Sequence, residues 1–145
     1  SSTMKRALQT AEAINRYANV SIHVRRELRE IEAGDYDKNG YEFIKELIKL
    51  EADIPYPNGE CGADVWRRAC QVLEEIEKTK YENIAIVAHG GTIRSIICGI
   101  LGMPQSKRFF LGENLEHCSI THVMKVNERY FLQTFNDYTH LGSVI

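Results

Sequence analysis

Apolar positions at helical spacing predict four helices along the chain. The first begins just after Ser1 and Ser2, which are good N-cap residues, and has its apolar stripe between residues 4 and 14. Two more helices have their stripes at residues 43–48 and 65–76, and the segment between them contains two prolines and a glycine. The fourth covers residues 93–101 and ends at a glycine followed closely by a proline.

Shorter apolar patterns predict the strands. Residues 20–24 alternate between apolar and polar side chains, and residues 84–88 are continuously apolar, as in a strand that is buried on both faces of a parallel sheet. Residues 120–126 and 130–135 alternate on either side of Asn127-Glu128 and predict a terminal hairpin. Strands that alternate with helices predict an α/β fold with a mainly parallel sheet flanked by helices. We expect residues 1–145 to belong to one domain, because no linker divides them.

Composition narrows the range of partners. The formal charge of -2 offers no basic surface for nucleic acid, and no apolar run reaches the roughly 20 residues that span a membrane. The four cysteines include no Cys-x-x-Cys pair, which indicates free thiols in a reducing compartment. We expect a cytoplasmic protein with a small-molecule partner, and its oligomeric state stays open.

A zinc site formed by His117, Cys118 and His122 is the one metal site considered. The two histidines are separated by an odd number of residues on a predicted strand, so their side chains point to opposite faces. We therefore expect no metal.

His89 lies where the strand at residues 84–88 ends and Gly90 and Gly91 open the next helix. Ligands gather at the carboxyl ends of strands in α/β sheets, and a helix N-terminus offers free N–H groups to an anion. The two glycines let a ligand approach the backbone closely. The pattern indicates a phosphate site, although a histidine that only caps the strand fits it equally well.

Arg6 and Glu30 are two further candidates. Arg6 stands in the first turn of a helix, where a cation opposes the helix dipole unless an anion is bound nearby. Glu30 lies in a long polar loop, at residues 25–39, and such loops often carry function. The alternative for both is a solvated surface charge, and spacing alone does not separate Glu30 from the other acidic residues of its loop.

Five segments carry a resemblance to a known family. Residues 1–11, Ser-Ser-Thr-Met-Lys-Arg-Ala-Leu-Gln-Thr-Ala, closely resemble the Ser-Ser-x-Leu-x-Arg-Ala-x-Gln-Thr-Ala segment of the histidine phosphatase (phosphoglycerate-mutase-like) superfamily. Residues 28–34 resemble its Leu-x-Glu-x-x-x-Gly motif, and residues 57–60 resemble its Pro-x-Gly-Glu motif. Residues 87–94 resemble its second-histidine motif, and residues 136–141 resemble its C-terminal end. All five occur in the family's order.

The resemblance implies roles for the candidates. Arg6 would clamp the transferred phosphoryl group with its planar fork, and His89 would bind the phosphoryl oxygens with help from the Gly90 and Gly91 backbone. Glu30 would protonate the leaving oxygen and then deprotonate water. Glu60 belongs to a family motif, and we assign it to loop structure. The family reaction passes through a phosphohistidine and needs no cofactor.

Two departures qualify the resemblance. The family supplies its nucleophilic histidine from an Arg-His-Gly motif, and no such motif occurs in the chain. We expect that motif on a strand upstream of residue 1, within a missing segment on the order of 50–60 residues, because one βαβ unit takes about 30. The 145 residues by themselves are then expected to be inactive. The segment after Gly34, residues 35–40, also departs from the family pattern.

The resulting hypothesis is a phosphatase that hydrolyses a small phosphate monoester. A phosphoglycerate mutase of the same family is the first alternative, although it usually carries longer inserts around the site. An inactive relative that binds a phosphorylated ligand or a protein is the second. The joint presence of Arg6, Glu30 and His89 favours an enzyme over that second alternative.

Overall fold

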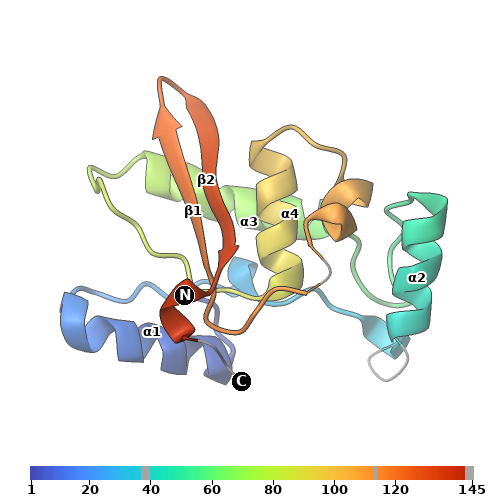
Figure 1. Ribbon diagram of the computed structural model, residues 1–145, viewed down its shortest axis with the longest axis horizontal. Helices are drawn as coiled ribbons and strands as arrows, with labels where there is room; N and C mark the ends of the chain where they lie inside the picture. The colour runs from blue at the N-terminus through green and yellow to red at the C-terminus, as the bar shows by residue number, and fades with distance from the viewer. Residues whose placement is uncertain (37–39, 113, 143–145) are drawn as a thin grey trace. The chain divides into compact units, whose positions relative to one another are not determined.

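The computed structural model describes residues 1–36, 40–112 and 114–142. The chain divides into two compact units, Ser1–Leu111 and Gly112–Ile145, and each is described by itself (Figure 1). The prediction of one domain stays a prediction. Within the described ranges no helix is both long and apolar enough to cross a membrane.

Helix α1 covers Lys5–Ala18 and starts later than the two serines suggested. Its N-cap is Met4, and no side chain caps it. The Ser2 hydroxyl instead accepts a hydrogen bond from the Met4 amide at 3.2 Å, just before the helix. The helix ends at Asn19, a residue type that tolerates the left-handed conformation found there, with φ of 50°.

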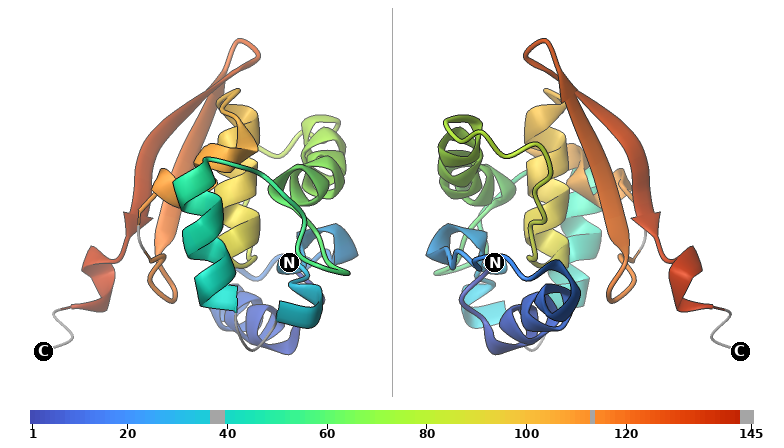
Figure 2. Two further views of the ribbon diagram at one scale, coloured as in Figure 1. Left: turned by 90° about the vertical axis from the view of Figure 1, so that its right-hand side faces the viewer. Right: turned by 90° about the vertical axis from the view of Figure 1, so that its left-hand side faces the viewer.

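The other three predicted helices are confirmed. They are α2 at Gly40–Leu50, α3 at Gly62–Glu77 and α4 at Gly90–Ile100. Helices α3 and α4 pack against each other in the first unit: α3 passes behind α4 in Figure 1, and Figure 2 shows the two helices side by side. The core lies there and is formed by Leu28, Ala69, Val72 and Ile96. Leu28 belongs to the short 3₁₀ helix η1, Arg26–Leu28, so the core also fixes the start of the Glu30 loop.

The two segments predicted as strands in the first unit form no ladder among the described residues. Ser2 forms one parallel bridge with Arg25, and its amide also donates to the Val87 carbonyl at 2.9 Å. Apolar side chains of both segments are exposed, including Val20 and Ile84. Ser1 also accepts from the Arg25 amide and donates to the His23 carbonyl. Two residues are too few to form a strand between the two segments, because a ladder is built from several successive pairs. The mainly parallel sheet therefore stays a prediction.

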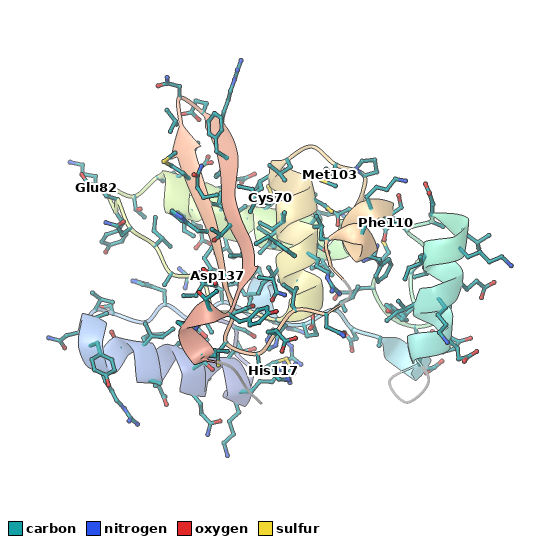
Figure 3. The ribbon with its side chains drawn as sticks, in the orientation of Figure 1. Cys70, Glu82, Met103, Phe110, His117 and Asp137 are labelled. Carbon is teal, nitrogen blue, oxygen red and sulfur yellow. The ribbon has the colours of Figure 1, made fainter. Side chains whose placement is uncertain are left out.

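Two further 3₁₀ helices lie in the connections of the first unit. The 3₁₀ helix η2, Gly34–Tyr36, precedes α2, and η3, Gln105–Phe110, follows α4. Figure 3 shows Met103 between α4 and η3, and Glu82 in the loop that leads from α3 back towards α4. Residues 37–39, half of the segment 35–40 where the departure was noted, lie outside the described ranges.

The second unit contains the predicted hairpin. Strands β1, Ile120–Val126, and β2, Arg129–Asp137, pair in antiparallel register with Val123 opposite Leu132. Asn127 and Glu128 both have positive φ angles, 47° and 63°, as a two-residue hairpin loop of type I′ requires. The 3₁₀ helix η4, Thr139–Leu141, follows β2, and Figure 3 labels Asp137 at this junction. The hairpin prediction is confirmed.

Candidate active site

The N-terminal end of α4 gathers the predicted residues. His89 is the N-cap of α4, with extended backbone angles, and its side chain is buried with 5% of the residue exposed. The change from extended to helical backbone occurs at Gly90, as predicted. Figures 1 and 2 both show this end of α4 close to α1 and η1.

Both ring nitrogens of His89 have partners. The Arg6 Nε donates a hydrogen bond to His89 Nδ1 over 3.2 Å. Because a guanidinium can only donate, Nδ1 must be unprotonated, and the ring proton lies on Nε2. His89 Nε2 lies 2.8 Å from the Ser2 hydroxyl oxygen and donates to it in this tautomer. The structure therefore brings Arg6 and His89 together, although 83 residues separate them in the chain.

The surroundings keep the His89 ring neutral. Burial lowers the pKa of His89 below its usual 6.5, because the charged form loses hydration. Glu30 acts in the opposite direction, and the positive charges of Arg6, Arg68 and Arg29 lower the pKa further. An anion bound beside Arg6 would offset those positive charges and favour a protonated ring.

Glu30 accepts hydrogen bonds at the same helix end. Its carboxylate accepts from the Thr92 amide at 3.1 Å, the Gly91 amide at 3.3 Å and its own neighbour, Ile31, at 2.9 Å. A Cβ atom at Gly91 would come within 2.7 Å of Glu30 Oε1, so only glycine permits this approach. The carboxylate thus occupies a position that the helix dipole makes favourable for an anion.

The five predicted site residues therefore converge on one helix end. Arg6 donates a hydrogen bond to His89, and the Glu30 carboxylate accepts one from the Gly91 amide. In the described part of the chain the Gly90 amide has no hydrogen-bond partner. A cation, a neutral imidazole, a carboxylate and an available N–H group lie around one point, which suits a phosphate ester.

A polar hollow of about 370 Å³ opens on the other side of the Glu30 loop. Glu30, Glu60 and Arg68 are among its lining residues, whereas Arg6 and His89 are not. The hollow therefore marks the back of the loop, and we place the reactive end at His89.

Sequence reasoning missed two polar residues that hold this site. Ser2 is fully buried and bonds His89, but its position before a helix made it look like an N-cap. Thr92 is also fully buried, and its hydroxyl donates to the Arg29 carbonyl at 2.6 Å, which ties α4 to the Glu30 loop. No local pattern signals either contact, because both partners lie far away in the chain.

Comparisons with known proteins agree with this arrangement. Residues 1–138 match the histidine phosphatase superfamily (branch 1). The chain is 27% identical to the putative phosphoserine phosphatase 2 of Hydrogenobacter thermophilus, in a match that covers 97% of the chain and 72% of that protein. The chain belongs to the histidine phosphatase superfamily.

Two solved structures show the same fold. A phosphoserine phosphatase from Entamoeba histolytica is 25% identical and superposes with a TM-score of 0.79 over 97% of the chain and 73% of that structure. A mycobacterial glucosyl-3-phosphoglycerate phosphatase in complex with VO3 is 24% identical, with a TM-score of 0.81 over 94% of the chain and 73% of that structure. The neighbours show the histidine phosphatase fold, with which the predicted α/β class agrees. The protein is by class a phosphoric monoester hydrolase.

Proposed function

We propose that the protein hydrolyses a small phosphate monoester through a phosphohistidine. The observation that carries the proposal is the Arg6 guanidinium on the His89 ring, at a helix end that also holds the Glu30 carboxylate. The nucleophile would be a histidine of the family's Arg-His-Gly motif, which the 145 residues do not contain. The match at residues 1–138 spans both compact units, which supports one domain.

Arg6, His89 and Gly90 would hold the phosphoryl group. Arg6 presents a planar fork that matches two phosphoryl oxygens, and its present partner is a neutral ring that an anion can replace. His89 and the Gly90 amide would donate to the remaining oxygens. These donors are held in place before the reaction, so they stabilise charge that moves in the transition state without reorganisation.

Glu30 would handle the proton. In the first step Glu30 would act in its protonated form: the nucleophilic nitrogen bonds to phosphorus, the bond to the ester oxygen breaks, and the proton of the Glu30 carboxyl moves to that oxygen. In the second step water attacks phosphorus, its proton passes to the Glu30 carboxylate, and the bond from phosphorus to nitrogen breaks. Free phosphate leaves, and both residues return to their starting states.

The names of the relatives guide the choice of substrate. One is named a putative phosphoserine phosphatase, a second is a phosphoserine phosphatase, and a third is a glucosyl-3-phosphoglycerate phosphatase. We therefore propose a small phosphorylated metabolite as substrate, with O-phosphoserine as the first compound to assay.

The phosphoenzyme is the direct test. The complete protein, including the expected nucleophile segment, is mixed with radiolabelled O-phosphoserine or p-nitrophenyl phosphate and quenched within the first turnover. We expect labelled protein whose phosphate is lost in acid and retained in base, as for a nitrogen–phosphorus bond. Arg6→Ala should abolish labelling, whereas Arg16→Ala, an exposed arginine in the last turn of the same helix, should not.

Opposite chemical behaviour would contradict the proposal. A phosphoenzyme that survives acid and is lost in base would indicate a carboxylate nucleophile. Turnover with no phosphoenzyme, abolished by a chelator, would indicate a metal-activated water.

A further inference from the structure

Arg68 and Glu60 form a two-point ion pair behind the Glu30 loop. Arg68, in α3, donates from Nε to Glu60 Oε1 and from Nη2 to Glu60 Oε2, both over 2.9 Å. The side chains are 19% and 24% exposed, so water screens the pair only partly. Parallel double bonds of this kind fix the relative orientation of both groups, and a single contact does not. We call Arg68 and Glu60 together the brace.

The brace also forms hydrogen bonds with the backbone on both sides of Glu30. Arg68 Nη1 donates to the Glu27 carbonyl, and Arg68 Nη2 donates to the Glu30 carbonyl at 3.2 Å. Glu60 Oε2 accepts from the Glu32 amide at 3.0 Å, and the Glu60 amide donates to the Glu32 carbonyl at 2.8 Å. The backbone of residues 27–32 is thus held before, at and after Glu30.

We propose that Arg68 and Glu60 are positioning residues that aim the Glu30 carboxylate at the leaving oxygen. This inference rests on the proposed function. The Glu30 carbonyl is bound to Arg68 while its carboxylate reaches the Gly91 and Thr92 amides, so the brace fixes one end of the residue whose other end carries the proton. Reacting groups are sensitive to such placement, and a displacement of about 1 Å can cost a factor of 10² in rate.

The surroundings of the brace favour positioning over support of the core. The hollow of about 370 Å³ lies against it, so water can enter where the guanidinium is removed, and no dry cavity is left. The neighbouring arginine offers a comparison. Arg67 pairs with Asp64 at 2.9 Å on the surface and is 72% exposed, and such pairs contribute little.

The test uses Arg68→Lys in the complete protein with two aryl phosphates as probes. Lysine keeps the charge but cannot make the two-point contact or reach both carbonyls at once. We expect kcat/KM, which reports the step that releases the leaving group, to fall on the order of 10–10²-fold for phenyl phosphate, whose phenolate leaves poorly. For p-nitrophenyl phosphate, whose leaving group needs little protonation, kcat/KM should change less than about threefold. Arg67→Lys is the matched control and should change neither rate.

Glu60→Gln provides a second route to the same result. It keeps the shape of the side chain and removes its charge, so it should show the same substrate pattern with a smaller loss. In a Glu30→Gln background, Arg68→Lys should cause no further loss for phenyl phosphate, because the group that it positions no longer carries a transferable proton.

The outcomes separate this inference from the proposed function. Equal losses on both substrates in Arg68→Lys, together with a lowered Tm, would show a purely structural role and overturn the inference alone. Equal losses on both substrates in Glu30→Gln itself would remove Glu30 as the proton donor and overturn both. A strong substrate dependence in Glu30→Gln with unchanged rates in Arg68→Lys would leave the proposed function intact and reject the brace.

Discussion

Helices α3 and α4 begin in the same way and serve different ends. In the first turn of each helix, two consecutive backbone amides donate to the carboxylate of a residue that precedes the helix. At α3 the Gly62 and Ala63 amides donate to Asp53, both over 2.8 Å. At α4 the Gly91 and Thr92 amides donate to Glu30 over 3.3 and 3.1 Å.

The two helix ends differ in the residues that surround each carboxylate. Asp53 pairs with Arg108, which is 2% exposed and also donates to the Gln105 carbonyl at 2.9 Å. That carboxylate is enclosed and its charge is neutralised, so it joins elements together. Glu30 lies next to a neutral His89 and the Arg6 guanidinium. A carboxylate on a helix end can therefore take part in a reaction when its neighbours, like Arg6 and His89, are free to bind a substrate instead of each other.

The largest expected effect is the loss of stability when the Asp53–Arg108 pair at the start of α3 is broken. Asp53→Ala leaves Arg108 buried without its carboxylate, and loss of one partner of a buried pair costs about 3–5 kcal/mol. Glu30→Ala removes a helix cap and should cost about 1 kcal/mol. Urea unfolding of both variants at neutral pH measures the free energies. Equal costs would mean that the two helix ends do not differ in the way described.

Gly91→Ala should lower activity, whereas Gly62→Ala should lower stability. In Gly91→Ala the new Cβ meets Glu30 Oε1 at 2.7 Å and displaces the carboxylate, so activity should fall on the order of 10²-fold with a small change in Tm. In Gly62→Ala the Cβ meets Arg108 Nη1 at 2.8 Å within a packed cluster, so stability should fall by about 1–3 kcal/mol while activity holds. Steady-state rates and melting curves of the pair decide. Matching profiles for the two variants would count against separate roles.

The smallest expected effect is a pH dependence of stability that comes from His89 at the start of α4. The folded-state pKa of His89 lies below its usual 6.5, so the unfolded chain takes up the proton first as pH falls. Stability from this residue is complete above pH 6.5 and declines below it until the folded-state pKa is reached, by at most about 1.4 kcal/mol per pH unit. Tm measured from pH 7.5 to 5 should therefore fall less in His89→Asn than in the parent. A parent curve with no such decline would show that the His89 ring is not held neutral.

Prediction from sequence worked where the signal was local. Four helices, the start of α4 at Gly90 and the Asn127-Glu128 hairpin all follow from spacing and turn chemistry within a few residues. The strand predicted at residues 84–88 shows the limit of such prediction. An apolar run indicates that a segment favours burial, but it does not supply the neighbouring strand that a ladder needs.

The site was predictable in its members and not in its connections. Arg6, Glu30 and His89 could be named from the chain and the family resemblance. The hydrogen bond from His89 to Ser2 joins residues 87 positions apart, and the contacts of Arg68 with the Glu30 loop join residues 38–41 positions apart. A polar side chain carries no mark of its distant partner, since that choice depends on which elements the fold brings together.

The central claim is that Glu30 donates the proton to the leaving group. The most direct test compares Glu30→Gln with the parent, in the complete protein, on phenyl phosphate and p-nitrophenyl phosphate. We expect kcat/KM to fall by about 10²–10⁴-fold on phenyl phosphate and by much less on p-nitrophenyl phosphate. Equal losses on the two esters would contradict it.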